Sequence, residues 1–78
     1  MNREYARQRA ADMRADWELA QRGYDRMSVL AADENQPWGI RYQAAVFADF
    51  ALEHTYAFER LERRYLEFTK ELDSNGNS

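Results

Sequence analysis

The sequence holds two long runs of residues at heptad spacing, separated by a single cluster of turn-forming residues at positions 33–39. Before the cluster, apolar residues follow one another at alternate steps of four and three from Ala6 to Ala31. After it, the same steps lead from Ile40 to Leu72, with one histidine among them. Steps of this kind place side chains along one side of an α-helix, as in the seam of a coiled coil. The sequence therefore predicts two long helices and an all-α fold.

The short connection between the two runs decides how the helices are arranged. A connection of only about five residues makes two helices antiparallel neighbours. We therefore expect a long antiparallel two-helix hairpin that forms a single domain. The expected bounds are residues 1–73 for the domain, about 3–33 for the first helix, 33–37 for the turn, about 37–72 for the second helix and 74–78 for a disordered tail.

Gly23 leaves one question open within the first helix. Glycine costs about 1 kcal/mol in the interior of a helix, and it often marks a helix end. The heptad steps nevertheless continue through this position. Either the first helix is continuous, with at most a slight kink, or it breaks at Gly23 and a short separate helix follows from about Asp25 to Ala32.

Folding the sequence about the bond between residues 35 and 36 brings Trp17 opposite His54 in the expected seam. We expect these two side chains to form a buried polar part of the core, with the imidazole either stacked on the indole or hydrogen-bonded to Tyr24 or Tyr56. A single histidine without companion carboxylates does not make the metal site of a helical bundle. Its expected role is therefore structural, and protonation of a buried imidazole near neutral pH would weaken the assembly.

Between Trp38 and Phe58 the second run is apolar well beyond its seam, whereas the back of the first helix is mostly charged. One partner helix covers one side only, and monomers rarely expose a large apolar patch. We therefore expect a symmetric homodimer in which the second helices meet and complete a four-helix bundle; the alternative is a larger host protein on the same face. The residues expected at this dimer or partner interface are Tyr42, Val46, Asp49, Phe50, Leu52, Glu53, Tyr56 and Ala57.

The residues that most enzymes and metal sites need are missing. There is no cysteine, the chain has one histidine, and no phosphate-binding loop or set of serine, histidine and aspartate is present. We expect no enzymatic activity, no cofactor and no metal. No apolar run reaches the length of a membrane span and the N-terminal segment is charged, so we expect a cytoplasmic protein. Ten arginines against one lysine are typical of GC-rich coding, as in many bacteria and their phages.

Arginines gather near the open end of the expected hairpin and offer an alternative function. In an antiparallel register the arginines of the N-terminal segment approach those that follow position 59, and together they form one basic end. Acids are interleaved with them and the net charge is −3, which opposes binding to a polyanion. The alternative is thus a nucleic-acid-associated helical dimer that uses a basic patch of Arg3, Arg7, Arg9, Arg14, Arg60, Arg63 and Arg64.

The turn itself is a candidate docking tip, formed by Gln36, Pro37 and Trp38, because a tryptophan beside a turn is available to a partner. Together these features favour a non-enzymatic protein–protein interaction module. We expect a small homodimeric regulator, inhibitor or adaptor that acts by binding a larger protein.

Overall fold

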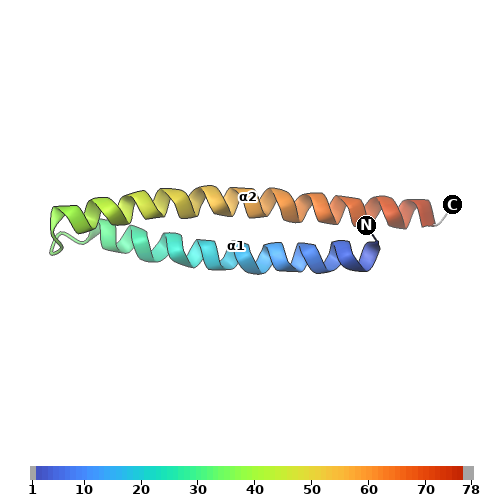
Figure 1. Cartoon of the computed structure of the whole chain (residues 1–78), viewed down its shortest axis with the longest axis horizontal. Coiled ribbons are helices and arrows are strands. Elements are labelled where there is room, and N and C mark those ends of the chain that lie inside the picture. The colour runs from blue at the N-terminus through green and yellow to red at the C-terminus, as the bar shows by residue number, and fades with distance from the viewer. Residues whose placement is uncertain (1, 77–78) are drawn as a thin grey trace.

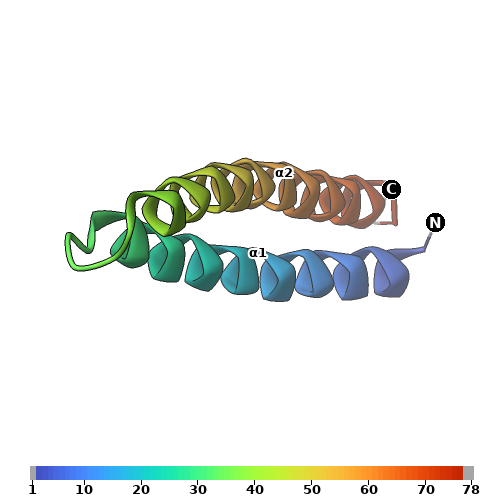
Figure 2. The same cartoon turned by 60° about the vertical axis from the view of Figure 1, so that its left-hand side comes forward.

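Two helices make up the fold. The computed structural model describes the backbone of residues 2–76 and the side chains of residues 2–72. Helix α1 spans Arg3–Ala32 and helix α2 spans Trp38–Gly76, with 30 and 39 residues. They lie side by side in opposite directions, and α2 extends past the start of α1 (Figures 1 and 2). The all-α, antiparallel hairpin that the sequence predicts is confirmed.

Helix α1 begins at an N-cap that the heptad pattern did not indicate. The Oδ1 of Asn2 accepts a hydrogen bond of 2.8 Å from the backbone N–H of Tyr5, and the Asn2 carbonyl accepts the first helical bond from Ala6 at 3.0 Å. The Glu4 carboxylate adds negative charge in the first turn. Both features stabilise a helix start, because the first N–H groups have no partner within the helix.

Gly23 does not interrupt α1, so the continuous alternative is the one that the structure contains. A Cβ atom built at this position would meet no atom within 4 Å outside the local helix backbone. No close contact therefore requires glycine here. The residue only lowers the stability of the helix, by about 1 kcal/mol relative to alanine.

The turn between the helices is held by a short series of hydrogen bonds. The Oδ1 of Asp33 accepts from the N–H of Asn35 at 3.0 Å, and the Asp33 carbonyl accepts from the N–H of Gln36 at 3.1 Å. The Pro37 carbonyl then accepts from the N–H of Arg41 at 3.1 Å, which is the first bond of α2. Asp33 thus closes the turn and Pro37 precedes the new helix, where its missing N–H costs nothing.

Helix α2 ends later than the sequence predicts. It continues to Gly76, whereas we expected an end near residue 72 and a tail from residue 74. Aspartate, serine and asparagine each lower helix stability by less than about 0.7 kcal/mol relative to alanine, so none of them stops a helix outright. The last two residues of the expected tail, Asn77 and Ser78, lie outside the described residues.

The side of α1 that faces α2 is the one that the heptad pattern predicts. All eight members of that run are buried or half-buried: Ala6, Ala10, Met13, Trp17, Ala20, Tyr24, Met27 and Ala31.

The side of α2 that faces α1 differs from the prediction by a rotation. The alternate members of the predicted run remain half-buried or buried, as Ala44 and Ala51 illustrate. The other members, among them Phe47 and His54, are exposed except for the half-buried Phe68, and the residues that directly follow them in the sequence are buried or half-buried. The residues of α2 that face α1 at steps of three and four are therefore Arg41, Ala44, Ala48, Ala51, Thr55, Phe58, Glu62, Tyr65 and Thr69.

Small side chains explain this rotation. Ala44 is 2% exposed, and Ala48 and Thr55 are also buried. Alanine and threonine allow two helix backbones to approach closely, whereas a line of phenylalanine, histidine and leucine at the same positions would hold them apart. A prediction from hydrophobicity alone selects the most apolar stripe of α2. The helices instead pack along the stripe whose side chains are small.

The pairing between the helices is also shifted along their axes. Folding about residues 35 and 36 predicts Glu62 beside Arg9. Instead, the Nε of Arg14 lies 4.0 Å from Oε2 of Glu62, and Arg9 hydrogen-bonds to Tyr65. These contacts differ from the predicted register by about one helical turn, so Trp17 does not face His54.

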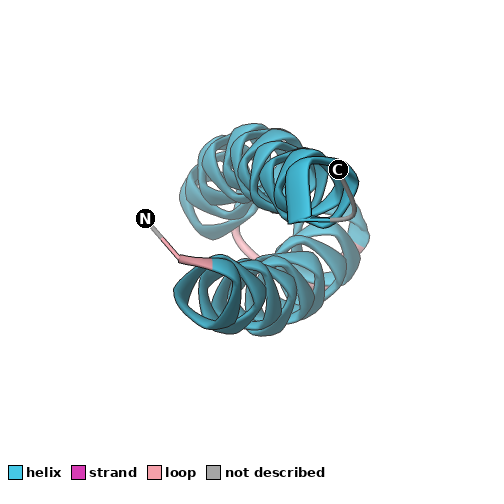
Figure 3. Cartoon of the chain, turned by 90° about the vertical axis from the view of Figure 1, so that its right-hand side faces the viewer, coloured by secondary structure: helices cyan, strands magenta, loops and turns pink. Residues whose placement is uncertain are grey.

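The hairpin encloses little apolar volume. Within the described residues the buried hydrophobic side chains are four alanines and one methionine, and none of the large side chains is fully buried. The radius of gyration is 17.7 Å, against about 11.5 Å for a compact domain of the same length. Seen end-on, the two helices curve about each other (Figure 3). Each helix therefore leaves most of its circumference exposed.

Candidate interaction surface on α2

Large apolar side chains are exposed mainly on α2. Of the eleven that are exposed in the described part of the chain, eight belong to this helix. Phe47 and Phe50 expose 53% and 56% of their surface, and Ile40, Tyr42 and Tyr56 are similarly accessible. The hairpin thus leaves its most apolar surface on one helix.

Five residues of this surface form a second stripe at heptad spacing. They follow one another at steps of three and four, and we call them the outer stripe: Phe47, Phe50, His54, Ala57 and Leu61. Each lies one residue before a position that faces α1. One residue of helix corresponds to a rotation of about 100°, so the outer stripe runs parallel to the contact with α1, about 100° around α2.

The predicted buried polar core of Trp17 and His54 is not formed. His54 is exposed, and its ring lies 6.2 Å from that of Phe58 on the same helix, tilted by 43°. Trp17 is half-buried beneath the guanidinium of Arg14, whose central carbon lies 4.6 Å from the indole ring centre. The prediction was wrong because it depended on the seam of α2, which is rotated away from its expected position.

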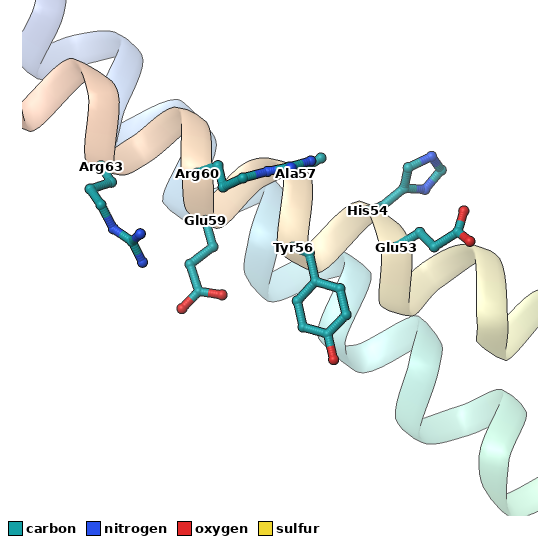
Figure 4. A pocket seen from close by; sticks show the side chains of 7 residues that line it. All are labelled: Glu53, His54, Tyr56, Ala57, Glu59, Arg60 and Arg63. Carbon is teal, nitrogen blue, oxygen red and sulfur yellow. The ribbon is translucent and has the colours of Figure 1, made fainter.

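Charged side chains surround the outer stripe in a definite order. A shallow groove on α2 is lined by Glu53, His54, Tyr56, Ala57, Glu59, Arg60 and Arg63 (Figure 4). Going along the helix, the acids Asp49 and Glu53 come first, and Arg60, Arg63 and Arg64 follow, with Glu59 between the two groups. Around the outer stripe the surface is therefore acidic at Asp49 and Glu53, and it carries three arginines interleaved with Glu59 and Glu62 farther along α2.

The interface residues that the sequence predicts all lie on the surface of α2. Tyr42, Asp49, Phe50, Glu53 and Tyr56 are exposed, while Val46, Leu52 and Ala57 are half-buried. Three members of the exposed apolar surface were instead assigned to the core: Ile40, Phe47 and Leu61. The signal that would have placed them outside is the stripe of small residues beside them, which begins with Ala44 and Ala48.

The predicted basic patch is interrupted by acids. The Nη1 of Arg9 lies 3.2 Å from Oδ2 of Asp12, and the hydrogen bond to Tyr65 raises the pKa of Arg9. Arg7 and Arg14 line a groove together with Glu62 and Leu66. On α2 the groove of Figure 4 mixes Arg60 and Arg63 with two glutamates. Arg3 and Arg64 are exposed.

The turn presents one prominent aromatic group. Trp38 is 75% exposed, and its ring stacks on that of Tyr42 at a centroid distance of 5.2 Å. Pro37 is exposed and Gln36 is half-buried. The candidate docking tip is therefore accessible, mainly through the tryptophan.

Known proteins provide no further guide to the role of this surface. No family model, no curated protein and no solved structure matches the chain significantly. Among the side chains of residues 2–72, no group of three histidine, cysteine, aspartate or glutamate residues is arranged to hold a metal ion. No helix in the same range has the length and apolar character that crossing a membrane requires.

Proposed function

We propose that this protein is a non-enzymatic protein–protein interaction module that works as a homodimer, with the outer stripe of α2 as its self-association surface. One observation carries the proposal: the buried residues of α2 are alanines and threonines, whereas Phe47 and Phe50 of the same helix remain exposed. Helix α2 packs on α1 through small side chains and leaves aromatic side chains on another side exposed. Exposed aromatic side chains of this kind point to a second binding partner for the helix.

The exposed area supports a second copy as that partner. The chain exposes 6029 Å², whereas a compact monomer of this mass exposes about 5000 Å². The difference of roughly 1000 Å² is similar to the 800 Å² or so that each partner buries in a standard interface. A dimer would therefore return the exposed surface per chain to the range of compact proteins.

A dimer of hairpins has a natural architecture. Two hairpins that join through α2 bring four helices together, and a four-helix bundle encloses a core that one hairpin lacks. The turn with Trp38 would lie at an end of this bundle. In this proposal it is the surface left for a larger protein, and the dimer acts as a small regulator, inhibitor or adaptor.

Sedimentation equilibrium at micromolar concentration tests the proposal. The wild-type chain should have twice its mass of 9.3 kDa, and Phe50→Glu should be monomeric. Val29→Glu is the matched control, because Val29 is 73% exposed but lies on α1, and this variant should remain dimeric. A folded wild-type monomer would refute the proposal.

DNA or RNA binding at low salt that is lost in Arg7→Glu but kept in Phe50→Glu would favour the nucleic-acid alternative instead.

A further inference from the structure

The outer stripe also defines how two copies fit together. We propose that α2 pairs with α2 of a second copy in antiparallel orientation along the outer stripe, with the two-fold axis beside residues 55 and 56. This inference rests on the proposed dimer and adds its orientation and register. A two-fold interface is self-complementary, so the residues on either side of the axis must suit each other.

The order of charges on α2 selects the antiparallel orientation. Asp49 and Glu53 lie on one side of the axis, and Arg60, Arg63 and Arg64, with Glu59 and Glu62 among them, lie on the other. Antiparallel pairing places Glu53 beside Arg60 of the partner subunit, and by symmetry the same pair forms twice. Parallel pairing in register would bring the acids of both copies to one level of the bundle and the arginines to another, so these oppositely charged pairs would not form.

The apolar members of the stripe fit the same axis. In antiparallel coiled coils a residue of one heptad class packs against the other class of the partner. This axis places His54 opposite Ala57 of the partner subunit, and Phe50 opposite Leu61 of the partner subunit. At the centre the imidazole of His54 faces the methyl group of Ala57, and in the next layer Phe50 faces Leu61. Large and small side chains thus alternate in the way that interdigitating packing requires.

The rotation between the two stripes fits a bundle. Each α2 contacts its own α1 on one side and the partner's α2 about 100° away. Neighbouring helices of a four-helix bundle meet a given helix at nearly this angle, because the four axes form an approximate square in cross-section. The two stripes of α2 thus suit two different neighbours.

Single cysteines test the orientation, since the chain has none of its own. Under mild oxidation His54→Cys should form a covalent dimer, because this residue and its copy are offset by only about 4.5 Å along the axis. Gln43→Cys lies on the same side of the helix, but its copy would be about 37 Å away, and no covalent dimer should form.

The outcomes separate this inference from the proposed dimer. Covalent dimers of both variants would indicate parallel pairing and overturn the inference. A dimer by sedimentation in which neither variant cross-links would also overturn it, while the proposed dimer would remain. A monomer by sedimentation would refute both.

A charge exchange tests the register independently. Glu53→Arg and Arg60→Glu should each weaken dimerisation by roughly tenfold, because each reverses two ion pairs in the symmetric dimer. The double variant should recover most of the wild-type dissociation constant, since the pairs are restored with opposite signs. Residues 53 and 60 are two turns apart within one helix, so the recovery reports on contact between copies. A double variant that dimerises no better than the weaker single variant would overturn the register.

Discussion

The Nε of Arg41 donates a hydrogen bond of 3.0 Å to the carbonyl oxygen of Ala31, which joins the first turn of α2 to the last turn of α1. The last carbonyl groups of a helix have no partner within it, and a cation is favourable near them because the helix dipole is negative at that end. The contact is partly buried, so water replaces it poorly. This one side chain therefore closes α1 and orients α2.

Replacing Arg41 with methionine should lower the free energy of unfolding by about 1–2 kcal/mol, since it removes a charged hydrogen bond and leaves the Ala31 carbonyl partly unsatisfied. Urea denaturation followed by circular dichroism measures the change. Arg26→Met is the control, because Arg26 is exposed on α1, and it should change stability by less than about 0.5 kcal/mol. Equal effects of the two variants would show that the contact with Ala31 does not stabilise the hairpin.

Alanine at position 23 should stabilise the protein by about 1 kcal/mol, because the helix is continuous there and the new methyl group meets no atom. In a chain of this size the thermal midpoint should rise by about 4–8 °C. Gly39→Ala provides a comparison in the first turn of α2, where a Cβ atom also meets nothing within 4 Å. A lower midpoint for Gly23→Ala would indicate that this glycine has a contact or conformational role.

A larger side chain at a position of α2 that faces α1 should lower the free energy of unfolding, whereas the same substitution at a nearby exposed position should not. Ala48→Leu places a large side chain where Ala48 is buried between the helices, and we expect a loss of about 1–3 kcal/mol from overpacking. Ala45→Leu, at an exposed position of α2, is the matched control. If the two variants were equally stable in thermal melts, the contact surface of α2 would not pass through Ala48.

Heptad spacing and one turn cluster are sufficient to predict the hairpin and the contact surface of α1. Seven successive steps of four and three in α1 leave no competing stripe, since its other sides carry mostly charged residues. In α2 two stripes with the same spacing compete, one through Phe47 and His54 and one through Ala48 and Thr55. Apolar character favours the first and close packing favours the second, and the spacing does not decide between them.

The same competition explains which parts of the candidate surface could be predicted. Tyr42, Phe50 and Tyr56 lie outside both versions of the seam, so their exposure followed directly from the pattern. His54 was misplaced because its environment changes completely with a rotation of one residue. The N-cap at Asn2 was missed for another reason: a cap is formed by one side chain and leaves no periodic signal.

Thermal stability should depend on protein concentration if the enclosed core forms only when two hairpins associate. Mass action stabilises a dimer by about 2.7 kcal/mol when its concentration rises a hundredfold, for example from 1 to 100 μM. For two chains of this length the thermal midpoint should then rise by about 5–10 °C. Differential scanning calorimetry at the two concentrations measures the shift.

Phe50→Glu should melt at a lower temperature that does not change with concentration, since it removes an aromatic anchor without touching the contact with α1. A wild-type midpoint that is the same at both concentrations would show that the hairpin is stable alone and that its exposed phenylalanines serve a partner other than itself.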